Sequence, residues 1–344
     1  MKTRTALQGA AAMAAGYLAW DRFRRRSWIN LQDKIVLVTG GSRGLGLQLA
    51  REFGARGAAV AICGRNQTSL DRAKADLAGR RVRTCARVCD VSDRTQVESL
   101  IAHVSQQLGP IDILVNNAGI ILVGPFTEMA LSDFEQALGT MFWGMLYTTL
   151  AVLPSMRERR QGSIVNITSI GAKVSIPHLL PYSCAKFAAL ALSQGLHSEL
   201  APDGINVTTI VPGLMRTGSH LKAEFKGKHI PEYSWFGTAA ATPLVSIAAR
   251  RAARAIVRAT IRREGEKVLS APADLMARLH DVSPEVTGMI LSLVNRLLPS
   301  RALGEGGEIR TGAEIEANLN STIWNAVTWP GQKAAASLNQ LSDL

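Results

Sequence analysis

The stretch that decides the fold is Ile35-Val36-Leu37-Val38-Thr39-Gly40-Gly41-Ser42-Arg43-Gly44-Leu45-Gly46. Its first four residues form a continuous apolar run, which is typical of a strand buried on both faces of a sheet. After the glycines, Leu47, Leu49, Ala50 and Phe53 recur at helical spacing. The order strand, glycine turn, helix predicts the first unit of an α/β fold.

Similar units follow along the chain. Apolar runs at 58–63, 82–88, 111–115, 163–167, 205–210 and 267–270 alternate with helical patterns at 69–77, 94–108, 130–156, 182–200 and 243–263. Short apolar strands that alternate with helices predict a parallel sheet covered on both faces. We therefore expect an α/β fold, a doubly wound Rossmann-type parallel sheet of about seven strands.

The length of 344 residues fits one large domain with extensions. We expect an apolar and basic N-terminal segment at 1–30, the Rossmann-type domain at 31–270, and a helical C-terminal extension with a loosely ordered tail at 271–344. In the extension, Ser283-Pro284-Glu285 predicts the start of a helix. An apolar stripe from Val286 to Leu298 follows, and it has three candidate partners: the core, a second subunit, or a membrane surface.

The formal net charge of +12 is concentrated in two segments. Residues 1–30 hold six basic side chains against Asp21, and residues 243–263 hold six arginines with no acid. The rest is nearly neutral, which argues against a nucleic-acid-binding surface. A solvated amphipathic helix is the default interpretation of the second segment.

The four cysteines have no disulfide or metal-site spacing, so we expect no metal and four buried thiols in a reducing compartment.

The N-terminus contains a 15-residue apolar run, Ala6–Trp20, broken only by Gln8, Gly9 and Gly16. A cluster of arginines at 22–26 follows it, which suits a retained anchor better than an exported signal peptide. A helix packed on the protein's own surface is the alternative. The predicted location is cytoplasmic, with membrane association through the N-terminus as an open hypothesis.

The glycine turn suits phosphate binding, because glycines let a diphosphate approach the backbone and the helix start supplies free N–H groups. A tight turn without a ligand is the alternative for this motif taken alone. The second strand ends in Cys63-Gly64-Arg65-Asn66, with no acid for a ribose 2′-hydroxyl. Arg43 and Arg65 can instead pair with a 2′-phosphate, which predicts NADP, unless both are merely solvated.

Later motifs make a resemblance specific. The turn Thr39–Gly46, Asp90-Val91, Asn116–Gly119, Tyr182–Lys186 and Pro212-Gly213 occur in this order. Over roughly residues 31–270 the chain resembles the classical short-chain dehydrogenase/reductase family. The resemblance implies that a nicotinamide dinucleotide is bound by Gly40, Ser42, Arg43, Gly44, Leu45, Gly46, Arg65, Asp90, Val91, Asn116, Asn117, Ala118, Gly119, Tyr182, Lys186, Pro212, Gly213, Met215 and Thr217.

The predicted catalytic residues are Ser169, Tyr182 and Lys186. Tyr182 and Lys186 lie one helical turn apart, so the ammonium is expected to lower the phenol pKa from about 10. The resemblance implies that Tyr182 is the general acid or base and that Ser169 binds the substrate oxygen. One residue departs from the family: Met141 stands where an Asn is usual, which puts the proton relay in question, and the neighbouring Thr140 is a poorly aimed substitute for it.

The segment Gly218–Thr242 corresponds to the part of the family that covers the substrate. Its aromatic residues Tyr233, Trp235 and Phe236 indicate either an apolar substrate or ordinary packing. The leading hypothesis is an NADP-dependent oxidoreductase for a small-molecule carbonyl or alcohol, with a homo-oligomer left open. The alternatives are a nucleotide-binding module of the same fold with lost or altered catalysis, and a membrane-surface adaptor.

Overall fold

The computed structural model describes residues 28–243, 245–300, 308–319 and 322–341. The strands of the main sheet are β1 (Ile35–Val38), β2 (Ala59–Gly64), β3 (Thr84–Val88), β4 (Ile113–Asn116), β6 (Gly162–Ile167), β7 (Ile205–Val211) and β11 (Glu266–Val268). The helices that pack on this sheet are α2 (Gly44–Gly54), α3 (Gln67–Gly79), α4 (Arg94–Gln107), α6 (Gly144–Glu158), α7 (Leu180–Glu199) and α9 (Ala249–Ile261), whereas α5 (Leu131–Leu138) packs on α7.

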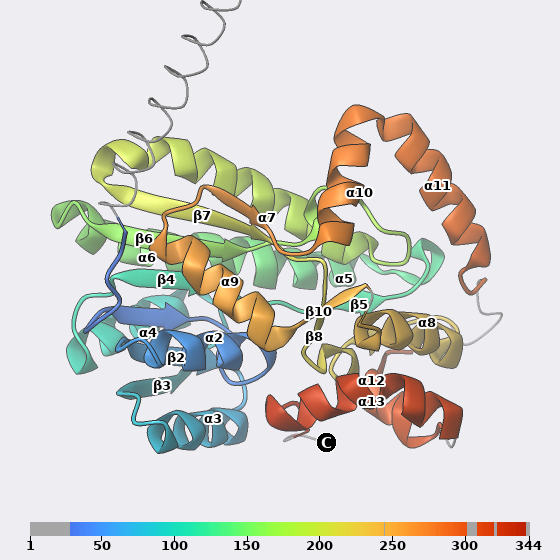
Figure 1. Cartoon of the computed structure of the whole chain (residues 1–344), viewed down its shortest axis with the longest axis horizontal. Coiled ribbons are helices and arrows are strands. Elements are labelled where there is room, and N and C mark those ends of the chain that lie inside the picture. Colours follow the sequence, from blue (N-terminus) through green and yellow to red (C-terminus); the bar gives the residue numbers. More distant parts are fainter. Residues whose placement is uncertain (1–27, 244, 301–307, 320–321, 342–344) are drawn as a thin grey trace, which may run out of the picture.

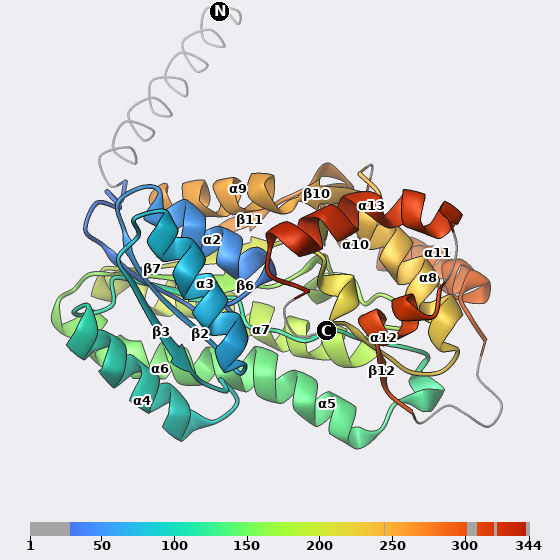
Figure 2. The ribbon, with the colours of Figure 1, turned by 90° about the horizontal axis from the view of Figure 1, so that it is seen from below.

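The main sheet is parallel and has seven strands in the order β11-β7-β6-β4-β1-β2-β3. Helices lie on both faces of it (Figure 1, Figure 2). The predicted doubly wound Rossmann-type sheet of about seven strands is thus confirmed. Strand order reverses between β1 and β4, and in such sheets ligands bind outside the carboxyl ends of the strands at this switch point.

Alternation along β1 explains how one strand serves both faces. Val36 and Val38 pack into a core with α2, α3 and α9, whereas Ile35 and Leu37 pack into a second core with α4, α6 and the end of α7. Successive side chains of a strand point to opposite faces, so a sheet covered on both sides needs an unbroken apolar run.

The predicted helix at 130–156 is interrupted. A π-helical turn, η2 (Gly139–Trp143), separates α5 from α6. The predicted helix at 243–263 also differs, since α9 begins only at Ala249 and is preceded by β10 (Ser246–Ala248), which pairs with β8 (Leu214–Arg216). The apolar face of α9 lies in the core, and its arginines are mostly outside it.

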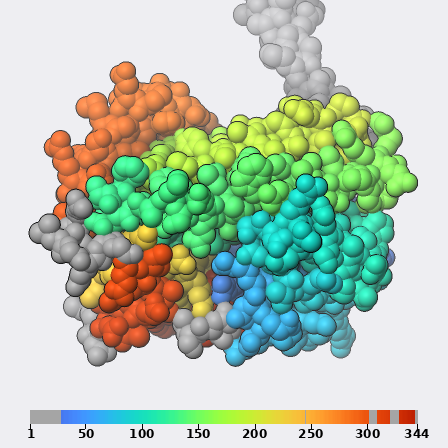
Figure 3. Space-filling model, turned by 180° about the vertical axis from the view of Figure 1, so that it is seen from behind, coloured from blue at the N-terminus to red at the C-terminus, as the bar shows by residue number. Residues whose placement is uncertain are grey.

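The expected loosely ordered tail is wrong for the residues that the structure describes. β12 (Arg310–Thr311) pairs with β9 (Glu224–Phe225), which pairs with β5 (Leu122–Val123). After α12 (Gly312–Ala317), α13 (Thr322–Ser337) packs on α8 (His229–Ala241). In the space-filling view these C-terminal elements, in orange-red, appear on the same face of the molecule as the N-terminal part of the Rossmann-type domain, in blue and cyan (Figure 3). Pairing with distant strands orders a segment that has no periodic pattern of its own.

The apolar stripe of the extension does not cover the core. It lies on α11 (Pro284–Leu297), which has Ser283 as its N-cap, as predicted, and forms a hairpin with α10 (Ala271–Val282). Met289 is 72% exposed and Leu297 is 82% exposed. The hairpin projects from one corner of the molecule (Figure 1), so this face has no partner within the described residues.

Two other sequence expectations concern membranes and thiols. In the described part of the chain, one helical stretch, Leu131–Glu158, is long and apolar enough to span a membrane, and its second part, α6, packs on the main sheet. The predicted anchor at 1–30 lies outside the described residues apart from its last three positions.

Cys63, Cys85 and Cys89 are buried free thiols, but Cys184 is exposed, which corrects the expectation that all four thiols are buried. It shares the exposed face of α7 with Phe187, three residues on, whereas Ala185 and Lys186 are buried.

Candidate active site

A cavity of 640 Å³ opens at the carboxyl ends of β1, β4 and β6. The structure brings nearly all predicted site residues to its wall: Gly40, Ser42, Arg43, Gly44, Leu45, Gly46, Arg65, Asp90, Val91, Asn117, Ala118, Gly119, Ser169, Tyr182, Lys186, Pro212, Gly213, Met215 and Thr217. Asn116 is the exception. It lies inside the domain, where Thr148 Oγ1 donates to its Oδ1 at 2.6 Å and its Nδ2 donates to Asn166 Oδ1 at 2.9 Å.

The glycine turn is held in place from β4. Thr39 Oγ1 accepts hydrogen bonds from the backbone N–H of Asn117 (2.9 Å) and of Ala118 (3.0 Å). The Asn117 amide donates back to the carbonyl oxygen of Thr39 at 2.9 Å. These contacts satisfy the polar groups of two strand ends and fix the two loops that flank the cavity.

The turn fits a dinucleotide diphosphate. A Cβ atom on Gly46 would lie 2.2 Å from the carbonyl oxygen of Gly40, so only glycine allows this close packing. Gly44 has a φ of +57°, in the left-handed region that glycine tolerates, and it begins α2. The start of a helix presents backbone N–H groups and partial positive charge to an anion.

The second strand brings positive charge to the same cavity. Arg65 follows Gly64 at the end of β2, and Arg43 immediately precedes α2. Burial raises the pKa of the Glu224 carboxyl, while the positive charge of Arg65 opposes that rise. Arg65 therefore lies close enough to the cavity rim to act electrostatically on groups there.

Three side chains form the catalytic constellation. Ser169 follows β6, its Oγ accepts from the backbone N–H of Gly171 at 3.0 Å, and its hydroxyl lies near enough to Tyr182 to affect the phenol pKa. Tyr182 lies in the first turn of α7, one turn before Lys186. The Lys186 ammonium lies 5.8 Å from the centre of the Tyr182 ring.

The electrostatics differ from the expectation for Tyr182. Burial raises the pKa of the Tyr182 phenol, and the nearby Ser169 hydroxyl acts against that rise. Burial also lowers the pKa of Lys186 to about 8. The predicted lowering of the phenol pKa by Lys186 is wrong for this structure, because desolvation of the hydroxyl outweighs the effect of its neighbours.

Met141 is buried behind the cavity and does not line it. It belongs to the π-helical turn η2, is 1% exposed, and packs with Ala137 and Ala185. A Cβ atom on Gly119 would lie 3.5 Å from its sulfur. Thr140, one residue earlier, lines the cavity instead. The π-helical turn thus turns the Met141 side chain into the interior.

The aromatic residues of the covering segment pack inside it. Tyr233 and Phe236 are buried with Phe225 and Ile315, and Trp235 packs against the same cluster. None of the three lines the cavity. The second of the two interpretations, ordinary packing, is therefore the one that the structure bears out, and these residues lend no support to an apolar substrate.

Sequence reasoning missed several cavity residues. Ser219, Lys222, Ala223 and Glu224 reach the cavity from the covering segment, and Gln340 reaches it from the end of the chain. No motif surrounds Gln340, so no local signal could have found it. Within the described residues, no group of three or more His, Cys, Asp or Glu side chains could hold a metal ion.

A phosphate-binding turn joined to a Ser, Tyr and Lys cluster defines the class of protein as a nicotinamide-dependent oxidoreductase. The family model for short chain dehydrogenase matches residues 34–226. The chain belongs to the short-chain dehydrogenase/reductase family, whose fold binds a nicotinamide cofactor and acts on small molecules.

Three similar proteins illustrate the match. Dehydrogenase/reductase SDR family member 7B of Danio rerio is 35% identical over 209 residues, which cover 59% of this chain and 67% of that protein. A short-chain dehydrogenase from Streptomyces avermitilis has a TM-score of 0.66 at 31% identity and covers 76% of this chain and 97% of its own. Actinorhodin polyketide ketoreductase, solved with NADPH, has a TM-score of 0.62 at 29% identity over 69% of this chain and 95% of its own.

Proposed function

We propose that the protein is an NADP-dependent oxidoreductase that acts on a carbonyl or secondary alcohol of an apolar small molecule. The observation that carries this proposal is the convergence of Ser169, Tyr182 and Lys186 with the glycine turn on one cavity. If these residues had only a structural role, they would not all need to line the same cavity.

The residues divide the chemistry between them. The bound cofactor would supply or accept the hydride. Tyr182 would donate a proton to the substrate oxygen or remove one, because it lines the cavity and carries an ionisable hydroxyl. Ser169, which lines the cavity together with Tyr182, would hold the same oxygen. Lys186, with a pKa of about 8, stays largely protonated at neutral pH and would hold the nicotinamide ribose.

The preference for NADP rests on Arg43 and Arg65. Both line the cavity at the end of β2 and the start of α2, and no acid follows β2. Guanidinium groups pair well with phosphate. With NADPH as the cellular cofactor, reduction of a carbonyl is the favoured direction.

The apolar substrate rests on Ile120, Ile121 and Met215, which line the cavity together with Tyr182. Lys222 and Glu224 add polar groups from the covering segment. The test is a screen of ketones, 3-oxoacyl thioesters, steroids and retinoids for NADPH oxidation, with Tyr182→Phe as the control. Turnover that Tyr182→Phe does not reduce would contradict the proposal.

A second candidate function is a nucleotide-binding module without turnover. The observation in its favour is Met141 in place of the usual Asn, with its side chain in the core. Tight NADPH binding with no turnover across the whole screen would support this candidate. Turnover of one screened compound would reject it.

We further propose a cytoplasmic location, with membrane association through residues 1–30, and a homo-oligomer. The free cysteines agree with a reducing compartment.

The homo-oligomer rests on large apolar side chains that are exposed on η2, α6 and α7: Trp143 (45% exposed), Leu150 (53%) and Phe187 (41%). Such side chains suit contact with a second copy of the chain. Light scattering of Leu150→Glu against the unmodified protein tests the oligomer, since a monomer in both cases would contradict it.

A further inference from the structure

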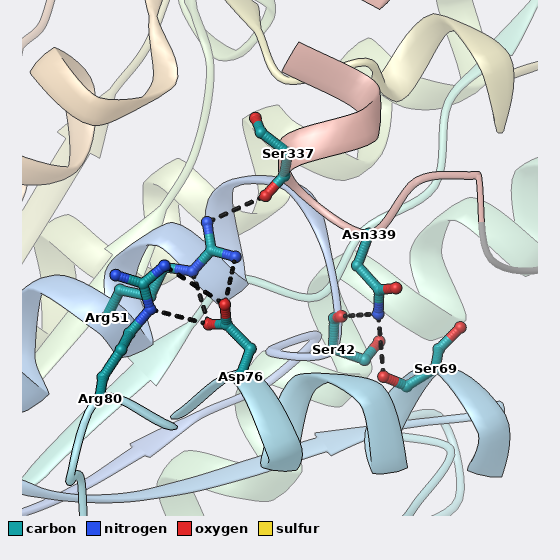
Figure 4. A network of polar contacts seen from close by, with 7 residues as sticks. All are labelled: Ser42, Arg51, Ser69, Asp76, Arg80, Ser337 and Asn339. Atoms are coloured by element: carbon teal, nitrogen blue, oxygen red, sulfur yellow. Dashed lines mark hydrogen bonds and ion pairs between the residues drawn. The ribbon is translucent and has the colours of Figure 1, made fainter. Parts of the chain in front are cut away.

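The end of the chain returns to the glycine turn. Asn339 Nδ2 donates to the carbonyl oxygens of Ser42 (2.9 Å) and Ser69 (3.0 Å), as Figure 4 shows. The carbonyl oxygen of Leu338 accepts from the backbone N–H of Gly44 at 2.9 Å. We call residues Ser337–Leu341 the C-terminal strap. Asn339 of the strap thus bonds to the turn, 297 residues earlier in the sequence, and to the first helical turn of α3, 270 residues earlier.

Two further contacts fix the strap. Arg51 of α2 donates from Nη1 to the carbonyl oxygen of Ser337 at 3.0 Å, and Asp76 of α3 accepts from the same guanidinium at 2.8 Å and 3.0 Å (Figure 4). Just before the strap, Ala335 lies close to Gly218. A Cβ atom added to Gly218 would lie 2.4 Å from the Cβ atom of Ala335. The end of the chain therefore touches both rims of the cavity, at Gly44 and beside Thr217.

Gln340 is the strap residue that reaches the cavity. It is 4% exposed and forms part of the cavity wall. Its Nε2 lies 2.7 Å from the position that a Cβ atom on Gly44 would take, at the first residue of α2. Its amide oxygen is buried and has no hydrogen-bond partner among the described residues. The oxygen is an acceptor and cannot bond to an anionic phosphate, so the atom of this amide that meets a diphosphate is the Nε2 donor.

The strap forms a wall of the cavity and does not fill it. With the strap in place the cavity still measures 640 Å³. Small-molecule and cofactor sites occupy about 300–1,000 Å³. The Leu338 carbonyl takes the Gly44 N–H, while the Gln340 amide places another N–H donor at the same end of the helix.

We propose that Gln340 is a cofactor-contacting residue whose amide donates to the diphosphate of the bound dinucleotide, and that Asn339 holds it there. The diphosphate is the part concerned because Gln340 lies at the start of α2, where a helix favours phosphate. This inference rests on the proposed function, since it needs a dinucleotide in the cavity.

The test measures binding of NADPH and NADH to the full-length protein, by nucleotide fluorescence for affinity and by stopped-flow displacement for release. Gln340→Ala should weaken both nucleotides about tenfold, mainly through faster release. Gln340→Glu should weaken them more than Gln340→Ala, because a carboxylate repels the diphosphate. Asn339→Ala should act in the same direction as Gln340→Ala. The matched control is Ser337→Ala, whose exposed hydroxyl is lost while its carbonyl keeps Arg51.

Unchanged affinity in Gln340→Ala, or tighter binding in Gln340→Glu than in Gln340→Ala, would overturn the inference. A loss confined to NADPH would also overturn it, because the contact would then be with the 2′-phosphate. If the unmodified protein binds neither nucleotide, the proposed function fails and this inference falls with it. Normal binding by the unmodified protein together with an unaffected Gln340→Ala rejects the role of Gln340 alone. Thermal melting without nucleotide shows whether each variant is folded.

Discussion

The Lys186 ammonium donates a hydrogen bond to the carbonyl oxygen of Ile167, 2.8 Å away at the end of β6. Both groups are buried, so this bond ties the first turns of α7 to the strand that precedes Ser169. It keeps the ammonium beside Tyr182 in a poorly solvated place. The charge is therefore costly, and burial lowers the Lys186 pKa to about 8.

This lowered pKa predicts a pH-dependent stability. Between about pH 8 and the ordinary lysine pKa near 10.4, the unfolded chain holds a proton that folded Lys186 has released. The contribution of Lys186 to the free energy of unfolding should therefore rise with pH across that window and be lowest below pH 8. Urea unfolding at pH 7.5 and 9.5 should show this rise relative to Lys186→Met. The exposed Lys74→Met serves as control, and equal slopes for Lys186→Met and the unmodified protein would contradict the assignment.

Tyr182→Phe should lower turnover by about 10²- to 10⁴-fold, the usual contribution of general acid–base catalysis. Affinity for NADPH should barely change, because the ring and its packing remain while only the hydroxyl is lost. Steady-state kinetics on a substrate found in the screen, together with nucleotide titration, measures both effects. Full activity in Tyr182→Phe would mean that another group moves the proton.

Arg65→Ala should remove most of a preference for NADPH over NADH that we expect to be at least about tenfold. Each charge-assisted pair of Arg43 or Arg65 with a 2′-phosphate contributes about 1.5–3 kcal/mol. Affinity for NADH should stay unchanged, since it lacks that phosphate. Titration with both cofactors decides the matter, and equal affinities for the unmodified protein would reject NADP specificity.

Met141→Asn should destabilise the protein by about 1–3 kcal/mol without raising turnover. The Met141 side chain is buried among Ala137 and Ala185, so an amide there would lose its hydrogen bonds to water. Met141→Leu, a swap of similar volume, should cost less than about 1.5 kcal/mol. Thermal unfolding and kinetics of the two variants provide the comparison. Faster turnover in Met141→Asn would show instead that the missing Asn limits catalysis.

Removal of residues 1–27 should release the protein from membranes while NADPH binding is unchanged. The cut is placed before Trp28 because Arg262 lies over that ring at 5.3 Å and Ile29 N–H donates to the Ile261 carbonyl at 2.9 Å. Fractionation of cells that express either form, at low salt, reads out the effect. A full-length chain found wholly in the soluble fraction would reject the anchor.

The sequence by itself determined the sheet and most of the candidate site. Buried parallel strands need unbroken apolar runs, and Ile35–Val38 and its counterparts are such runs. The phosphate turn needs glycine where a Cβ atom would clash, as at Gly46, so its spacing is visible in the chain. Local patterns therefore predicted β1 and α2, and the family resemblance of the later motifs predicted the positions of Ser169, Tyr182 and Lys186.

Only the tertiary structure decided which neighbours those residues meet. Asn116 lies in the motif of the site yet bonds to Asn166 in the interior, and Tyr233 packs in the covering segment and does not line the cavity. Gln340 reaches the turn through contacts made by Asn339 and Arg51. Such contacts join residues far apart in sequence, and their free energy depends on burial and distance, which no local pattern encodes.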